Sequence, residues 1–203
     1  MLKQTLVILL KFSAKNPPHR QAEKRYRQAY PKIPLKMRNE LLTDKLILKV
    51  VEKADAKNIH NLRTNTQVSK FIKRDLNKSL LDIENFIEER IKTDYFFTIN
   101  LKEKNEFAGT IAIWNIDHEK KYAELGYELL PSFQNKGIMT NAIKEVLNFA
   151  FNEMKFETIE AFTDKENLNS RKLLEKIGFK LVKNKIDEKN LNNVIYQIKN
   201  DCR

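Results

Sequence analysis

Residues Glu124 to Thr140 read E-L-G-Y-E-L-L-P-S-F-Q-N-K-G-I-M-T, and this stretch decides how the chain folds. The β-rich run 122–130 predicts a strand that ends at Pro131, because proline has no backbone N–H to give to a sheet. Apolar residues then recur at helical spacing, so a helix is expected over 137–152. The first N–H groups of a helix have no partner inside it, and its dipole favours negative charge there. The sequence therefore predicts a cradle for a phosphate or pyrophosphate group.

The loop before this helix resembles the Q/R-x-x-G-x-G/A motif of the GNAT family of N-acetyltransferases, which hold the pyrophosphate of acetyl-CoA. Met139 stands where the general motif has Gly or Ala. The form Q-x-x-G-x-M-T, preceded by E-L-G-Y, is similar to the branch that contains ribosomal-protein alanine N-acetyltransferases. The resemblance implies that acetyl-CoA is bound by Gln134, Asn135, Lys136, Gly137, Ile138, Met139 and Thr140.

A second motif, N-L-N-S-R-K-L-L-E-K-I-G-F, occupies residues 167–179. Asn167 is a good helix N-cap, and Gly178 is a suitable left-handed residue to end the helix. The segment is similar to the N-x-x-S-x-x-L-x-x-x-x-G-F element of the same family. The resemblance implies that Asn167 meets the pantetheine amides of acetyl-CoA, and that Ser170 lies near the thioester and the departing thiol.

The order of predicted elements agrees with the fold of that family. The expected strands lie at 46–51, 95–100, 106–115, 122–130, 158–163, 179–183 and 193–198, and the expected helices at 54–62, 80–91, 137–152 and 167–177. The predicted fold class is α/β, with a mixed, mostly antiparallel central sheet and helices on both faces. The resemblance implies that two central strands splay apart and that the pantetheine lies between them.

Charge divides the chain into two parts. Residues 1–38 hold ten of the 38 Lys and Arg residues, one of the 27 acidic residues and four of the five prolines. We therefore expect an acetyltransferase domain over 39–203 and a basic extension over 1–38 that is disordered or not native, with Met37 resembling the natural start. A transit peptide or an arm for anionic surfaces are the alternatives. Nucleic acid is expected as a partner only through residues 1–36.

The composition argues against a disulfide-stabilised, a metal-binding or a membrane-spanning protein. The single cysteine, Cys202, rules out an intramolecular disulfide and fits a reducing compartment, so a cytoplasmic location is expected. The three histidines show no metal-ligand spacing, and no metal is expected. No apolar run approaches the ~20 residues needed to span a bilayer, so no membrane partner is expected.

Acetyl transfer to an amine needs a proton acceptor, a donor for the tetrahedral oxyanion and stabilisation of the departing thiolate. The resemblance implies direct attack without an acyl-enzyme, with the backbone N–H of Leu129 as oxyanion donor and Ser170 at the leaving group. Glu124 and Glu128 share one face of their strand, and each is a candidate general base. Either could instead bind a substrate cation or face solvent. Tyr127 lies on the opposite face and is predicted to belong to the core.

The predicted acceptor is a primary amine, first the N-terminal α-amino group of a protein such as a ribosomal protein. One alternative is a small amine: an aminoglycoside, a polyamine or an amino-acid derivative. Another is a non-catalytic protein that binds acyl-CoA or the ribosome, with residues 1–36 holding RNA. The sequence leaves open the acceptor, the general base and the oligomeric state.

Overall fold

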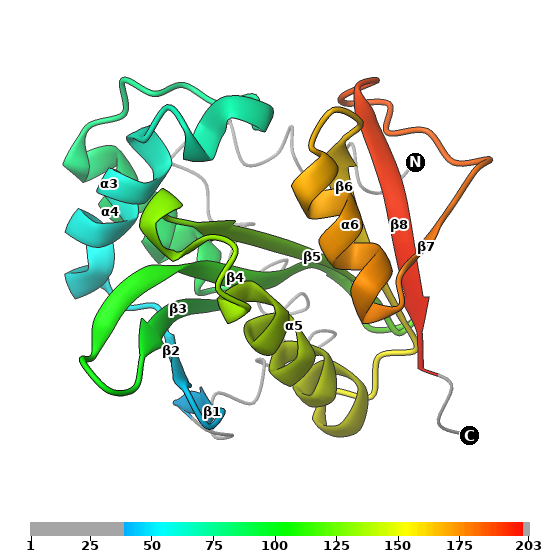
Figure 1. The fold of residues 1–203 in the computed structure, drawn as a ribbon, viewed down its shortest axis with the longest axis horizontal. Coiled ribbons are helices and arrows are strands. Elements are labelled where there is room, and N and C mark those ends of the chain that lie inside the picture. Colours follow the sequence, from blue (N-terminus) through cyan, green and yellow to red (C-terminus); the bar gives the residue numbers. More distant parts are fainter. Residues whose placement is uncertain (1–38, 201–203) are drawn as a thin grey trace, which may run out of the picture. The chain divides into compact units, whose positions relative to one another are not determined.

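An eight-stranded sheet runs through residues 39–200, the part of the chain that the structure, a computed structural model, describes (Figure 1). The strand order is β1-β2-β3-β4-β5-β6-β8-β7. Neighbours are antiparallel except for β5 and β6, which run parallel. The strands are β1 (Glu40–Leu42), β2 (Leu46–Val50), β3 (Tyr95–Leu101), β4 (Glu106–Asp117), β5 (Tyr122–Leu129), β6 (Thr158–Asp164), β7 (Lys180–Leu181) and β8 (Asn193–Lys199). The predicted α/β class with a mixed, mostly antiparallel sheet is confirmed.

Helices cover both faces of the sheet, as predicted. Helices α3 (Ala56–Thr64) and α4 (Leu80–Arg90) pack on one face, and α5 (Ile138–Asn148) and α6 (Leu168–Ile177) on the other (Figure 1). Because side chains alternate along a strand, the neighbours Phe96 and Phe97 of β3 enter the two different cores. Short helical turns complete the described chain: η1 (Lys53–Asp55), η2 (Val68–Phe71), η3 (Pro131–Phe133) and the π-turn η4 (Phe149–Glu153).

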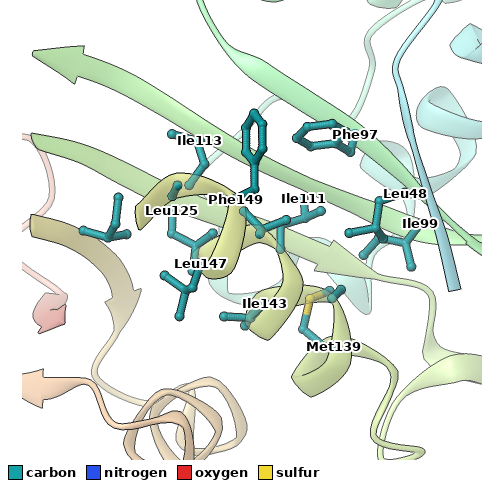
Figure 2. Close-up of a cluster of buried hydrophobic side chains, with 14 of the residues drawn as sticks. Leu48, Phe97, Ile99, Ile111, Ile113, Leu125, Met139, Ile143, Leu147 and Phe149 are labelled. Atoms are coloured by element: carbon teal, nitrogen blue, oxygen red, sulfur yellow. The ribbon is translucent and has the colours of Figure 1, made fainter. Parts of the chain in front are cut away.

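Helix α5 is held against the sheet by its apolar side. Met139, Ile143 and Leu147 point toward Ile111 and Leu125 of the central strands (Figure 2). Burial of such side chains contributes roughly 1.5–3 kcal/mol each. This packing places the start of α5 beside the end of β5, where the predicted cradle lies.

The local signals in the sequence are confirmed where they concern caps. Ser79 Oγ accepts from the Asp82 N–H at 3.2 Å and begins α4, and Gly178 ends α6 at φ +110°. Strand β1 was not predicted, because three residues are too few to show the alternation of apolar and polar side chains that marks a strand. The expected helix 137–152 leaves the α form after Asn148, where the π-turn η4 keeps Phe149 in the core. The closing strand expected over 179–183 shrinks to β7.

Strands β5 and β6 diverge, as the family resemblance implied. They pair only at three positions, the last of which joins Glu124 to Glu160. Beyond that pair, β5 continues to Leu129 beside β4, and β6 continues to Asp164 beside β8. The divergence leaves one side of β5 unpaired with β6 over its second half.

The extension 1–38 and Cys202 lie outside the described residues, so the expectations about them stay predictions. No helix among residues 39–200 is both long and apolar enough to cross a membrane.

A chain that begins at Met37 is expected to keep its melting temperature and turnover, because β1 still pairs with β2 and Leu41, 1% exposed, still fills the core. Thermal melts and acetyl-CoA turnover of the two chains test this. A shortened chain that is insoluble, or that melts more than a few degrees lower, would show that the extension is structural.

Candidate active site

The start of α5 has the geometry of an anion site. Gly137 lies just before the helix at φ +74°, in the left-handed region, and no side chain caps the helix. The first helical hydrogen bond runs from the Asn141 N–H to the Gly137 carbonyl at 3.1 Å. The N–H groups of residues 138–140 therefore lack partners in the preceding turn. A Cβ built on Gly137 would meet nothing within 4 Å, so the space at that position, next to the helix start, is open.

The side chains of this loop divide into two groups. Ile138 and Met139 are buried, at 8% and 7% exposure, so only their backbone faces the open side. Met139 therefore departs from the Gly or Ala of the general motif without filling the cradle, because its side chain enters the core (Figure 2). Gln134 donates from Nε2 to the Leu129 carbonyl at 3.0 Å, which ties the loop to the end of β5. Asn135 and Lys136 are exposed, and Thr140 is half-buried.

The backbone N–H of Leu129 points away from β4, toward the side of β5 that no longer pairs with β6. The Leu130 N–H donates to the Ala108 carbonyl at 2.9 Å, so residues 108 and 130 form a hydrogen-bonded pair. Such pairs alternate in antiparallel strands, so Leu129 and its partner Gly109 form a non-bonded pair. A Cβ on Gly109 would lie 2.1 Å from the Glu128 carbonyl oxygen, so only glycine permits the close approach of β4 here.

Helix α6 brings the second motif to the same place. The Asn167 side chain caps the helix by accepting from the Ser170 N–H at 3.2 Å, as predicted. Ser170 Oγ lies 2.9 Å from the hydroxyl of Tyr127 on β5. Tyr127 does face away from Glu124 and Glu128, as expected, but its hydroxyl joins the predicted Ser170 rather than packing only in the core. Burial raises the pKa of Tyr127 to about 12, so the phenol keeps its proton at neutral pH.

Glu124 is a buried carboxylate on the face of the sheet that α3 and α4 cover. It is 8% exposed, and its Oε1 accepts from Asn115 Nδ2. Burial raises its pKa above the ordinary range, the largest cause, while the Asn115 hydrogen bond lowers it. A carboxylate that holds a proton more readily than usual is suited to accept one from an amine.

Glu128 lies on the same face but is engaged by two arginines. Arg74 donates from both terminal nitrogens to the two carboxylate oxygens, each at 2.8 Å, and Arg63 donates to Oε1 at 3.4 Å. The Arg63 guanidinium also lies 4.1 Å from the centre of the Phe86 ring. Both carboxylate oxygens of Glu128 therefore already accept hydrogen bonds from guanidinium groups, so they are less available to an incoming amine than those of Glu124.

A second buried carboxylate closes the point where β5 and β6 diverge. Glu160, 2% exposed, accepts from the Tyr122 hydroxyl at 2.8 Å, from Gln197 Nε2 at 3.1 Å and from Lys185. Because Tyr122 has one hydroxyl proton, its longer 3.3 Å contact with Glu124 is secondary.

Tyr122, Lys185 and the two arginines belong to this site and were not predicted from the sequence. Arg63 and Arg74 lie on α3 and in the segment before α4, which carry no motif. The alternation of β5 could have pointed to Tyr122, which shares the face of Glu124. Within residues 39–200, no group of three or more His, Cys, Asp or Glu side chains is placed to hold a metal.

Residues 45–180 match the acetyltransferase (GNAT) domain family. The chain is 37% identical over 95 residues to the probable N-acetyltransferase YjcK of Bacillus subtilis, a match that covers 45% of this chain and about half, 52%, of YjcK. The fold is shared with two solved structures under 25% identical. One is RimL, a ribosomal α-N-protein acetyltransferase in complex with coenzyme A (TM-score 0.71, 17% identity, 81% of this chain and 99% of that one).

The other is spermidine N-acetyltransferase from Vibrio cholerae in complex with CoA and spermine (TM-score 0.67, 20% identity, 76% of this chain and 94% of that one). The family match covers most of the described domain, including both motifs up to β7. The two sequence motifs form the uncapped start of α5 and the Asn167-capped α6. Both lie next to the point where β5 and β6 diverge. This chain therefore belongs to the GNAT acetyltransferase family and is an acetyl-CoA-dependent N-acetyltransferase.

Proposed function

We propose that the protein transfers the acetyl group of acetyl-CoA directly to the N-terminal α-amino group of a protein, with a ribosomal protein as the first candidate. The observation that carries this proposal is the divergence of β5 from β6 directly beside the start of α5. The thioester would lie along the unpaired part of β5, between the start of α5 and the buried carboxylate of Glu124. A cytoplasmic location, expected from the single cysteine, belongs to the same proposal.

Acetyl-CoA would enter from the α5 and α6 face. Its pyrophosphate would bind the N–H groups of residues 137–140, with Lys136 adding positive charge. The pantetheine would follow the unpaired side of β5 past Asn167. The thioester carbonyl would then meet the N–H of Leu129, whose direction away from β4 suits an oxyanion donor.

The acceptor amine would approach from the opposite face, because α5, α6 and the cofactor occupy the first. Glu124, Gly126 and Glu128 line that second face of β5. A Cβ at Gly126 would lie 3.4 Å from Trp114 Nε1, so glycine adds no side chain beside the indole. Gly126 lies between the two carboxylates on this face, and the amine would pass it on the way to the carbonyl.

The reaction then balances without a covalent enzyme intermediate. The neutral amine attacks the carbonyl carbon, and its proton would reach Glu124 through a chain of water molecules, because Glu124 lies five residues, roughly 16 Å, along β5 from Leu129. The Leu129 N–H stabilises the oxyanion. The C–S bond breaks with its electron pair on sulfur, and the thiolate accepts a hydrogen bond from Ser170 until it leaves.

The charges around β5 favour a protein terminus over a polyamine. Glu128 is already neutralised by Arg63 and Arg74, and Glu160 by Lys185. A polycation needs several free carboxylates, and these two are occupied. An α-amino group carries one charge, which it must lose before attack, so it needs only Glu124.

A panel of amines tests the proposal. Release of CoA is expected with peptides that carry free N-termini, and turnover should be at least about tenfold lower with spermidine or an aminoglycoside, which corresponds to ~1.4 kcal/mol of discrimination. N-terminally blocked peptides are the matched control. Faster turnover of the polyamine would make the small-amine alternative correct. No turnover with any amine, together with salt-dependent RNA retention that is lost without residues 1–36, would favour the non-catalytic alternative.

A further inference from the structure

The hydroxyls of Tyr127 and Ser170 connect β5 to α6 directly. Tyr127 lies in the half of β5 that no longer pairs with β6, and Ser170 lies in the first turn of α6. Their side-chain oxygens are 2.9 Å apart. The backbone of Ser170 is held independently by the Asn167 cap at 3.2 Å. The serine is thus fixed at two points, one through its backbone and one through its hydroxyl.

The hydrogen-bonding capacity of the two hydroxyls decides what the contact can do. A serine hydroxyl has one proton to donate and can accept two hydrogen bonds. If Ser170 donates to Tyr127, its proton is used and cannot reach a ligand. If Tyr127 donates to Ser170, the serine proton is free. A thiolate beside Ser170 is the stronger acceptor, so it selects the second arrangement, because hydrogen bonds to charged groups are stronger and successive bonds polarise one another.

The surroundings of Tyr127 support the donor role. Tyr127 is half-buried, and the raised pKa of its phenol keeps the proton on the oxygen throughout the neutral range. Among the described residues, Ser170 is the hydrogen-bond partner found for the Tyr127 hydroxyl. The hydroxyl therefore serves Ser170 in this structure.

We propose that Tyr127 is a positioning residue for acetyl transfer: its phenol donates to Ser170 Oγ, and this directs the Ser170 proton to the sulfur of the departing CoA. The inference rests on the proposed function, in which Ser170 stabilises the leaving group. When the C–S bond breaks, the electron pair stays on sulfur as the thiolate. The amine proton remains on Glu124, and the thiolate takes up a proton from water after it is released. Neither hydroxyl changes its protonation state.

The chain offers a matched control for this phenol. Tyr95 on β3 packs in the core that α5 covers, with its ring centre 5.4 Å from that of Phe149. Burial raises its pKa to about 12 as well, but its buried hydroxyl has no hydrogen-bond partner among the described residues. Tyr95→Phe and Tyr127→Phe therefore remove the same atom from similar surroundings, and only one of them touches Ser170.

The test is a double-mutant cycle on kcat. Ser170→Ala is expected to lower kcat about 10–100-fold, toward the lower end, with a smaller effect on the KM for acetyl-CoA. Tyr127→Phe should lower kcat about 3–10-fold, the equivalent of one neutral hydrogen bond. In the Ser170→Ala background, Tyr127→Phe should change kcat by less than about twofold, because a residue that acts through Ser170 has nothing left to direct. Tyr95→Phe should leave kcat unchanged.

The thiol pKa of bound CoA provides a second readout that packing alone would not move. Titration of the thiolate by ultraviolet absorbance should give a lower thiol pKa for CoA on the wild-type protein than on Tyr127→Phe, and Tyr95→Phe should match the wild type. This titration reads only folded, CoA-bound protein, so it stays informative if a variant melts earlier.

The possible outcomes distinguish a failure of the proposed function from a failure of the inference about Tyr127. If Ser170→Ala keeps the wild-type kcat, the leaving-group role in the proposed function fails, and the inference fails with it. If Ser170→Ala is slow while Tyr127→Phe matches the wild type in kcat and in the thiol titration, only the inference is overturned. Effects that multiply in the double variant would also overturn it, because Tyr127 would then act independently of Ser170.

Discussion

Replacement of Glu124 by Gln is expected to lower kcat by about 100- to 1,000-fold, within the usual range for loss of a general base. The amide has nearly the same shape and can still accept the hydrogen bond from Asn115. It cannot take a proton from the attacking amine. Acetyl-CoA affinity should change little, because the proposed pyrophosphate site lies on the other face of the sheet. Steady-state kinetics and calorimetry on the two proteins measure these effects.

The pH dependence of kcat/KM should also differ between the wild type and Glu124→Gln. Burial raises the pKa of Glu124 in the folded protein, so the active carboxylate is lost as the pH falls through a value above the ordinary glutamate range. The wild-type kcat/KM should therefore show an acidic limb at that value. In Glu124→Gln this limb should disappear, and the remaining rise with pH should follow deprotonation of the acceptor amine alone.

The same raised pKa has a consequence for stability. The folded state binds the Glu124 proton more tightly than the unfolded state does, so stability is lost as the pH rises through the unfolded pKa toward the folded one. Above the folded pKa the ionised carboxylate therefore opposes folding, and at such a pH Glu124→Gln should melt at the same temperature or higher. A variant that is both slow and clearly less stable would count against a specific chemical role.

Glu128→Gln is the matched control on the same strand. It should remove the charge partner of Arg63 and Arg74 and lower stability, because each half-buried guanidinium loses its carboxylate. The acidic limb of the pH profile should nevertheless persist. If Glu128→Gln abolishes that limb and Glu124→Gln keeps it, the assignment of the base is reversed.

Replacement of Gly137 by Val is expected to weaken acetyl-CoA binding by roughly 2–4 kcal/mol, on the order of 100-fold. Gly137 has φ +74°, which a β-branched residue adopts only under strain. Its Cβ position faces open space, so the new side chain would project where the phosphates would approach the backbone. Calorimetric titration with acetyl-CoA measures the loss, and circular dichroism checks the fold.

Gly178→Ala separates backbone strain from blocked binding. Gly178 also has a positive φ, +110°, and lies at the far end of α6 from the cradle. This variant should lower the melting temperature and leave acetyl-CoA affinity unchanged. Equal affinity of Gly137→Val and the wild type, with an intact fold, would show that the loop does not hold acetyl-CoA.

Elements with strong local signals could be predicted from the sequence. The cap at Asn167, the left-handed residues Gly137 and Gly178 and the apolar period of α5 each depend on neighbours within one or two turns. Short-range chemistry of this kind is visible in a linear pattern. The three-residue β1 and the two-residue β7 were misjudged because such short strands depend on the strands beside them.

Local sequence patterns were enough to predict a helix that begins at Gly137 after a central strand, and a second, capped helix that carries Ser170. The surroundings that distinguish the two candidate bases appear only in the folded protein. Glu124 and Glu128 have the same residue type and the same strand face, but Arg63 and Arg74 reach Glu128 from 65 and 54 positions away in the chain. Folding likewise brought Tyr127 to Ser170 across a separation of 43 residues. Burial and charge at a site depend on such distant partners, and no local pattern records them.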